Sequence, residues 1–531
     1  MISTSLLLVL CAIAPALLMT SGALLFRAAP HHAEAIVWGR FRLLAATALA
    51  FTLAVPLLTT WLPVAGTGVA FDASPWLALG PLTLWLAVLV QLLGTVIGVF
   101  STRYLQGEPG QARYAAALSG VLAAVHLLLL ADHWLVLIAA WAAVGLALQP
   151  LLCFYPDRPF ARLAAHKKRI ADRVADGFLL AAAALAWSEV GSGSLSALWA
   201  HLDQHGASVA LQASALCVAL AVILRTALFP VHGWLIQVME APTPVSALLH
   251  AGVVNLGGFV LIRLAPLLEA TEAARWLLVV CGLGTAVLAG MVMLTRISIK
   301  VRLAWSTVAQ MGFMVLECGL GLYSLAVLHL IGHSLYKAHA FLSASSVVRE
   351  SRLQRLRGQA AAAPSSLLLA PALSLGVVML VQAVGVAGAW PWWWNGVLAL
   401  AWAPLLWLPA RRAHEPSAAG VRALAGIALV AGLTLVSALA HLLPLGVSDA
   451  PATTAGYLAL AGVAALYLAL VMLQWQPQRL AAWRRWSYAG FYVDEFYTRF
   501  ALRVWPAGWS PAATRVPAAG SRDKPSMITS E

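Results

Sequence analysis

The chain has 531 residues, of which 62% are hydrophobic and only 10% are charged. Soluble domains carry about 25% charged residues, so this composition excludes an ordinary soluble protein and indicates one that crosses a membrane many times. The formal net charge is +13. In a membrane protein we expect this excess to mark cytoplasmic loops and to attract anionic lipid rather than nucleic acid.

Apolar runs of about 20 residues, the length that crosses about 30 Å of hydrocarbon, recur along the chain. They lie at 4–26, 43–63, 76–100, 114–131, 133–155, 174–190, 208–229, 243–265, 274–295, 300–320, 322–346, 365–388, 393–410, 421–443 and 454–474. We therefore predict an all-α polytopic membrane bundle of about 14–15 transmembrane helices without a large soluble domain. The first run has no preceding basic residue and no small-residue cleavage site, so we expect a retained span.

Most of the 33 lysines and arginines fall in alternate connections between these runs. Short loops rich in basic residues stay in the cytoplasm, so we expect the N-terminus outside, the C-terminus inside and an odd number of spans. The most basic connection is 157–173, with six lysines and arginines. An acidic cytoplasmic partner docking on this loop is an alternative explanation of its charge.

The five cysteines are isolated from one another and form no CxxC pair. Iron–sulfur clusters and structural zinc sites need such groupings. There is also no glycine-rich nucleotide loop after a strand-like run. We therefore expect no metal and no cofactor in this chain, and any redox or ATP-driven chemistry would belong to another subunit.

Residues 225–263 read RTALFPVHGWLIQVMEAPTPVSALLHAGVVNLGGFVLIR. Prolines at 230, 242 and 244 and the Gly257–Gly258 pair are expected to interrupt helices at membrane depth. Freed backbone groups are tolerated there only inside protein or beside a wet cavity. Arg225, Glu240 and His250 sit beside these predicted breaks, which makes them candidates for an ion path.

His329, His333 and Lys337 follow one another at a spacing of four in the apolar run 325–342. This spacing places them on one face of a helix. Each ionisable group inside a membrane costs roughly 2.5–3.5 kcal/mol even on lenient scales, so three on one face predict a function, and a proton path fits imidazoles and an amine in single file.

Three motifs together resemble a known family. PTPVSALLHA at 242–251, LAWSTVAQMGFM at 303–314 and VLHLIGHSLYKAHAFL at 327–342 are similar to landmarks of the antiporter-type subunits of complex I and of multisubunit cation/proton antiporters. GFYVDEFYTRF at 490–500 resembles the C-terminal portion of those subunits. The resemblance implies inverted repeats with broken helices, each supplying a half-channel, joined by a file of buried ionisable groups.

The resemblance also implies an organisation of the chain. N-terminal transmembrane helices would occupy 1–113, a first antiporter-like repeat 114–265 and a second, degenerate repeat 274–410. C-terminal helices would follow at 421–474 and a cytoplasmic tail at 475–531.

Roles are carried over by the same resemblance. Lys337, His333 and His329 match the family's central file, and His250 matches the histidine after the PTPVSAL segment. Arg173 with Asp176 matches an arginine–aspartate pair, Lys300 a lysine that begins the LAWST helix, and Arg225 a lysine on the broken helix. Arginine keeps its proton at physiological pH, so Arg225 can bias a neighbour but cannot relay a proton.

Two departures from the family pattern distinguish this chain. The family has a glutamate before VGL that pairs with the broken-helix lysine, where this chain has Ala142 and Ala143. The family also has a lysine on a second broken helix, yet residues 358–410 contain no Asp, Glu, Lys or Arg. Glu240 is a candidate to replace the missing acid by pairing with Arg225 or His250.

A short antiporter-like chain with these features resembles DabB-type membrane subunits of two-component inorganic carbon transporters. That resemblance implies a bacterial inner-membrane location and a large zinc-containing partner similar to a β-carbonic anhydrase, the DabA type. The subunit would couple a cation gradient, expected to be of protons, to CO2 or bicarbonate uptake. A multisubunit antiporter subunit, a complex I subunit and a membrane anchor that conducts nothing are the alternatives.

Simpler readings of several residues stay open at this point. Lys300 lies near Arg296 and Arg302, and in the simpler interpretation it belongs to a basic helix end whose side chains reach water. Arg173 and Asp176 would be an interfacial capping pair, and Glu240 would be a plain loop acid. His126 and His339 are expected to form packing hydrogen bonds.

Overall fold

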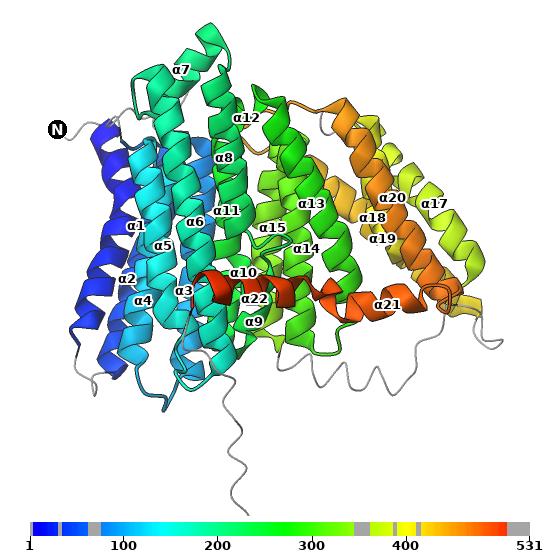
Figure 1. Ribbon diagram of the computed structural model, residues 1–531, viewed down its shortest axis with the longest axis horizontal. Helices are drawn as coiled ribbons and strands as arrows, with labels where there is room; N and C mark the ends of the chain where they lie inside the picture. Colours follow the sequence, from blue (N-terminus) through cyan, green and yellow to red (C-terminus); the bar gives the residue numbers. More distant parts are fainter. Residues whose placement is uncertain are drawn as a thin grey trace, which may run out of the picture.

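The structure, a computed structural model, describes residues 4–29, 34–61, 76–344, 362–385, 390–409 and 416–506, which are helices and short loops without a strand (Figure 1). Another of the basic connections expected in the cytoplasm is 349–357, with four arginines. It and the part of the tail after residue 506 lie outside the described residues.

The helices have the following bounds: α1 Thr4–Arg27, α2 Glu34–Trp61, α3 Pro81–Tyr104, α4 Gln111–Leu130, α5 Trp134–Leu152, α6 Pro159–Val190, α7 Leu195–His205, α8 Val209–Arg225, α9 Gly233–Gln237, η1 Val238–Glu240, α10 Thr243–Ala251, η2 Val253–Asn255, α11 Leu256–Arg263, α12 Ala265–Glu269, α13 Glu272–Met293, α14 Ile299–Gly319, α15 Tyr323–Leu342, α17 Pro364–Ala383, α18 Trp392–Trp402, η3 Ala403–Leu406, α19 Pro416–Ala440, α20 Thr453–Trp475, α21 Ala481–Tyr488, η4 Gly490–Tyr492 and α22 Val493–Val504.

Each predicted membrane run coincides with a helix or a helix pair, which confirms the all-α membrane bundle. Within the described residues, ten segments are long and apolar enough to cross a membrane, with α10 and α11 counted as one. The other predicted runs correspond to helices that are shorter or carry more polar side chains: α6, α8, α14, α15 and α18. These more polar helices carry most of the candidate residues.

The predicted loop at 157–173 is wrong, because this segment is the first half of α6. Pro159 stands in the first helical turn, where its missing N–H costs nothing. Lys167 and Lys168 point into the bundle and are buried. These two lysines therefore do not form a docking loop for an acidic partner, because both already pair with carboxylates within the chain.

The chain between α8 and α11 is broken, as the prolines predicted. Pro242 caps α10 and Pro244 lies in its first turn, while Gly252 separates α10 from η2 with a backbone outside the helical region. The Asn255 amide donates to the carbonyl of Ala251 at 2.9 Å and so satisfies one freed group. A polar side chain thus replaces backbone hydrogen bonding at the break.

The expected break at Gly257–Gly258 is wrong, since both glycines lie inside α11. A Cβ on Gly257 would come within 2.2 Å of Thr226, and one on Gly258 within 2.5 Å of Met314. These glycines permit close packing of α11 on its neighbours, which is the use of small residues in membrane helices.

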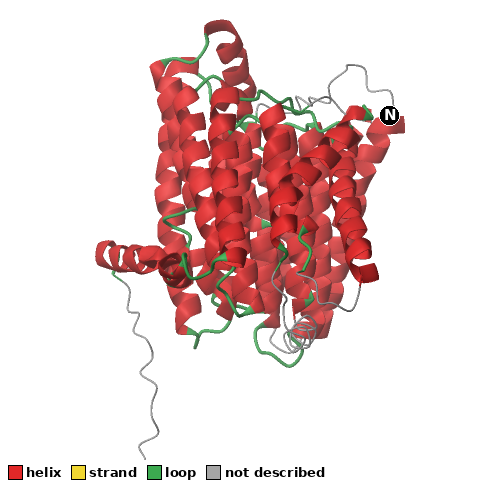
Figure 2. Ribbon diagram, turned by 90° about the vertical axis from the view of Figure 1, so that its right-hand side faces the viewer, coloured by secondary structure: helices red, strands yellow, loops and turns green. Residues whose placement is uncertain are grey.

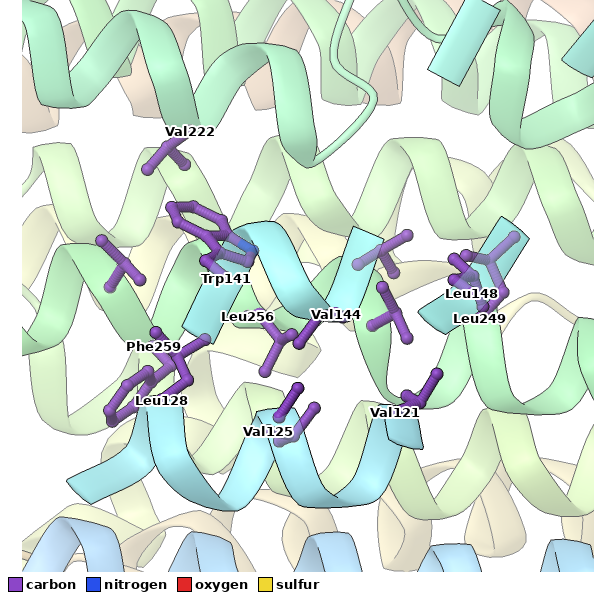
Figure 3. Packing of buried hydrophobic residues seen from close by; sticks show 14 of the residues in the cluster. Val121, Val125, Leu128, Trp141, Val144, Leu148, Val222, Leu249, Leu256 and Phe259 are labelled. Carbon is purple, nitrogen blue, oxygen red and sulfur yellow. The ribbon is translucent and has the colours of Figure 1, made fainter. Parts of the chain in front are cut away.

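The largest core lies around α11. Val125 and Leu128 of α4 and Val144 of α5 lie beside Leu256 and Phe259, and Trp141 of α5 lies toward Val222 of α8 (Figure 3). All of these side chains are buried. The broken helix is thus enclosed by rigid, apolar helices, which fixes the positions of the polar groups at its ends.

Gly312 of α14 tests the packing of α14 on α13. A Cβ there would approach the carbonyl oxygen of Gly282 and the amide of Ala286 to 2.7 Å, and backbone cannot move aside as a side chain can. We expect Gly312→Leu to destabilise the protein by more than about 3 kcal/mol, the upper end for overpacking. Gly284→Leu is the matched control, because its Cβ meets nothing within 4 Å. Thermal unfolding in detergent measures both, and equal stability of the two variants would contradict this packing.

Candidate functional site

Arg225 ends α8 and is buried, with 6% of its surface exposed. Its guanidinium donates to Asp176 of α6, and its Nε lies 3.9 Å from Asp172 Oδ1. The guanidinium also sits over the ring of Trp141, 4.5 Å from the centroid. A charge buried in this way requires paired carboxylates, and both come from α6.

Two further cations extend this group. Lys168 Nζ donates to Asp172 Oδ2, and Arg173 donates to Asp176 at 3.2 Å. The resulting Arg225 cluster alternates in sign: Lys168, Asp172, Arg225, Asp176, Arg173. We expected Arg173 to pair with Asp176, but the sharing of that acid with Arg225 was not expected.

The α6 carboxylates stand close to the part of α5 where the family's glutamate is missing. A Cβ on Gly145, two positions after Ala143, would come within 2.8 Å of Asp172 Oδ2. Asp172 was missed in the sequence, although its spacing of four from Asp176 places both on one helix face. In the first half of the chain, the buried cation Arg225 is therefore paired with acids from α6 and not with an acid on α5.

The second group of ionisable residues lies between α14 and α15. Lys337 is 1% exposed, and its Nζ donates to the carbonyl of Leu303 at 2.9 Å and to the hydroxyl of Ser306. His329 Nδ1 lies 2.8 Å from Glu317 Oε2, also on α14. Both ends of the predicted face therefore contact the same neighbouring helix.

His333 lies between these two residues along α15. Its ring centroid is 6.0 Å from that of His329, and neither ring nitrogen has a hydrogen-bond partner among the described residues. His250 of α10 stacks on Phe341 of α15 at 4.6 Å and likewise has no partner for its nitrogens there. The burial of these nitrogens without a described partner distinguishes His250 and His333 from His329, whose Nδ1 lies beside Glu317.

Glu317 was missed in the sequence. It is buried near the end of α14, and the only signal for it was an acid within an otherwise apolar run. With His329 it closes one end of what we call the central file, defined as His250, His329, His333, Lys337 and Glu317. The antiparallel course of α14 and α15 puts Lys337 and Glu317 at different depths.

Lys300 lies at the start of α14 and contacts the broken helix. Its Nζ donates to Thr243 Oγ1 at 2.8 Å, and Thr243 is 3.3 Å from the hydroxyl of Tyr104. Lys300 is therefore tied to the first residue of α10 rather than being only a basic helix end.

Glu240 does not pair with Arg225 or His250, which corrects that hypothesis. Its carboxylate accepts from the amide of Ala161 at 3.0 Å, and its carbonyl accepts from Arg158 at 2.9 Å. A carboxylate at a helix N-terminus is stabilised by the free amides and the helix dipole. Glu240 thus anchors the start of α6 to the broken segment.

Lys167 forms a separate contact outside the membrane-spanning part of α6. It donates to Asp494 of α22 at 2.5 Å and to Thr498 at 2.8 Å. Burial lowers the pKa of Lys167, and the charge of Asp494 opposes that shift. Nearby, His232 is buried and its ring stacks on that of Phe229.

Comparison with known proteins places this arrangement in a family. Residues 131–389 match the model of the NADH:quinone oxidoreductase/Mrp antiporter transmembrane region, and 61–115 match the N-terminus of complex I chain 5. The probable inorganic carbon transporter subunit DabB of Hydrogenovibrio crunogenus is 37% identical over 81% of this chain and 84% of its own length. The chain belongs to the DabB branch of the complex I and Mrp antiporter family.

Two more relatives define the extent of the likeness. The probable subunit DabB2 of Halothiobacillus neapolitanus is 49% identical, over 51% of this chain and 49% of that protein. A chain in the structure of the Mrp complex from Dietzia sp. has a TM-score of 0.60 and 24% identity, covering 91% of this chain and 59% of that one. The Mrp chain supports the fold, and the DabB relatives identify the branch. The protein is thus a multi-pass membrane subunit of a transport family.

Asp176 tests the charge balance of the Arg225 cluster. Asp176→Asn removes one of two carboxylates from a buried arginine, and breaking a buried ion pair costs about 3–5 kcal/mol. Asp203→Asn on α7 is the control, because that acid is exposed. We expect the unfolding temperature of Asp176→Asn to fall well below that of the control; equal values would contradict the pairing.

Proposed function

We propose that this protein conducts protons along the central file and couples their movement to uptake of CO2 or bicarbonate by a partner subunit. The single observation that supports this best is Lys337. Its amine is buried and bonded to a carbonyl and a hydroxyl, and within the described residues no carboxylate pairs with it. This ammonium is bonded only to neutral oxygens. When it loses its proton, no carboxylate is left without a positively charged partner.

Arg225 has the opposite environment and a different proposed role. Two carboxylates surround it, and arginine does not lose its proton in proteins. We assign it a fixed positive charge beside Asp172 and Asp176. The division into repeats at 114–265 and 274–410, one carrying the Arg225 cluster and the other most of the central file, forms part of the same proposal.

The direction of the path follows from charge distribution. The end of α15 that carries Lys337 precedes the basic stretch 349–357, which favours the cytoplasmic side. Glu317 and His329 would then face the outside. The proposed route enters at Glu317, passes His329, His333 and Lys337, and leaves beside Lys300, in a bacterial inner membrane.

The proposed partner is a large zinc-containing subunit similar to a carbonic anhydrase, of the type that accompanies DabB-type subunits. Hydration of CO2 releases a proton with each bicarbonate, so removal of that proton makes hydration directional. A proton path in the membrane subunit is suited to that coupling.

Lys337→Met tests the path. We expect this variant to insert normally but to abolish growth in air of a host that lacks its own carbon uptake, when it is expressed with the partner subunit. Arg162→Met is the control, because Arg162 is exposed on α6. Growth of Lys337→Met equal to wild type would refute the role of the amine.

Arg225→Lys and Arg225→Met test the fixed charge. Lysine keeps the positive charge, so we expect Arg225→Lys to retain more than about a tenth of the proton flux in proteoliposomes, a loss below about 1.4 kcal/mol. Methionine leaves two buried carboxylates without a cation, and flux should be lost. If both variants lose flux alike, geometry rather than charge is what Arg225 supplies.

A second candidate function is a membrane anchor that conducts nothing. The observation in its favour is the polar pair of α17 and α18, where Gln382 and Asn395 exchange hydrogen bonds at 2.9 and 3.1 Å. Neutral amides occupy this part of the bundle, and 358–410 has no Asp, Glu, Lys or Arg. Proteoliposomes with and without the partner distinguish the two functions, because absence of flux in both favours the anchor.

A further inference from the structure

The segment after α20 forms an arm, residues 481–504, made of α21, η4 and α22. It runs across the long helices at about the level where α20 ends (Figure 1) and lies outside them on one flank of the bundle (Figure 2). The arm contributes no residue to the central file or to the Arg225 cluster, so its surface needs a separate explanation.

One face of α22 packs on the bundle. Tyr497 and Ala501 are buried, and Asp494 accepts from Lys167 and from Gln237 at 2.7 Å. Gly233 of α9 leaves room for Asp494, because a Cβ there would lie 1.3 Å from its Oδ1. These contacts fix the rotation of α22 about its axis, and so they fix where its other side chains point.

The remaining surface of α22 divides into two faces. At 3.6 residues per turn, Phe496, Phe500 and Val504 form one stripe, exposed by 74%, 57% and 61%. Arg499 and Arg503 form another, together with Glu495. The helix therefore has a bundle face, an apolar face and a charged face along its whole length.

α21 continues the mixture of aromatic and basic side chains. Trp483, Trp486 and Tyr488 are exposed, and Arg484 and Arg485 lie among them. Arg484, Arg485, Arg499 and Arg503 form no ion pair within the described part of the chain. Tryptophan and tyrosine concentrate at the boundary between hydrocarbon and water, and unpaired arginines bind phosphate through their planar fork.

We propose that the arm lies in the membrane interface, with Phe496, Phe500 and Val504 among the acyl chains and Arg499 and Arg503 on anionic phospholipid headgroups. The separation of apolar and charged faces along a helix is the pattern of helices that lie on membranes. A protein-docking surface has instead an apolar centre with a polar rim. Continuity with α20, a membrane-spanning segment whose last residue Trp475 is exposed, also favours lipid.

A lipid-held arm has a mechanical consequence for the broken helix. Asp494 connects the arm to Lys167 of α6 and, through Gln237, to α9. Displacement of the arm from the bilayer would remove the partner of a buried lysine. The lipid surface therefore helps to position the segment between α8 and α10, whichever ion the bundle conducts.

The test is a spin-label scan of the full chain in vesicles of phosphatidylcholine with phosphatidylglycerol. Single cysteines at 495, 496, 499, 500, 503 and 504 are introduced after replacement of the five native cysteines. Oxygen collects in hydrocarbon and a nickel chelate stays in water, so their collision rates report the two surroundings. Leu429→Cys on α19 is the lipid reference and Asp157→Cys the water reference, since both positions are exposed.

We expect labels at 496, 500 and 504 to match the lipid reference and labels at 499 and 503 to match the water reference. Nickel access at 500 should rise in vesicles of phosphatidylcholine alone, and the variant Arg499→Gln/Arg503→Gln should lose this dependence on lipid charge.

Nickel access at 496 and 500 equal to the water reference would overturn the proposal. If labels on both faces become shielded only when the partner subunit is present, the arm binds that protein and not lipid, and the proposal is wrong. None of these outcomes depends on measured flux, so failure here is distinguishable from failure of the proposed function.

Discussion

The permanent charge of Arg225 is the constraint around which the first half of the bundle is arranged. A guanidinium cannot be neutralised by losing its proton, so its burial requires carboxylates in fixed positions. Asp172 and Asp176 supply them from α6, where Lys168 also pairs with Asp172 and Arg173 with Asp176. The close approach of Gly145 to Asp172 and the stacking of Trp141 on Arg225 show that α5 is shaped to this cluster.

The central file obeys a different rule. Its members are bonded to neutral oxygens, to one carboxylate at the His329 end, or to no described protein group. The Arg225 cluster is a set of paired charges, three cations around two carboxylates, whereas three of the five groups of the central file, Lys337, His333 and His250, have no charged partner among the described residues. The two clusters therefore differ in chemistry as well as in position.

The sequence predicted the elements well because membrane spans depend on length and hydropathy alone, which are local properties. The helix face of His329, His333 and Lys337 and the break near Pro242 follow from spacing and proline chemistry. Pairings between helices were harder. Glu240 was expected to pair with Arg225 because both flank the breaks, yet its carboxylate accepts from an amide at the start of α6. The contacts of Asp172 and Glu317 depend on the packing of α6 on α8 and of α14 on α15, which the sequence did not show. A buried pair is a property of two elements, and nothing local encodes the second partner.

The segment 157–173 shows why charge counts mislead at one particular place. Its six basic residues satisfy the pattern of a cytoplasmic loop, but two of them are buried. Lys167 pairs with Asp494 of α22, and Lys168 pairs with Asp172 on α6 itself. Asp494 is 327 residues away from Lys167 in the sequence. The arm therefore completes a site that begins in the first third of the chain, and removal of the arm would leave a buried ammonium without its acid. This dependence ties the motif VDEFYT to the integrity of α6 and α9, a role that its distance from the central file would not suggest.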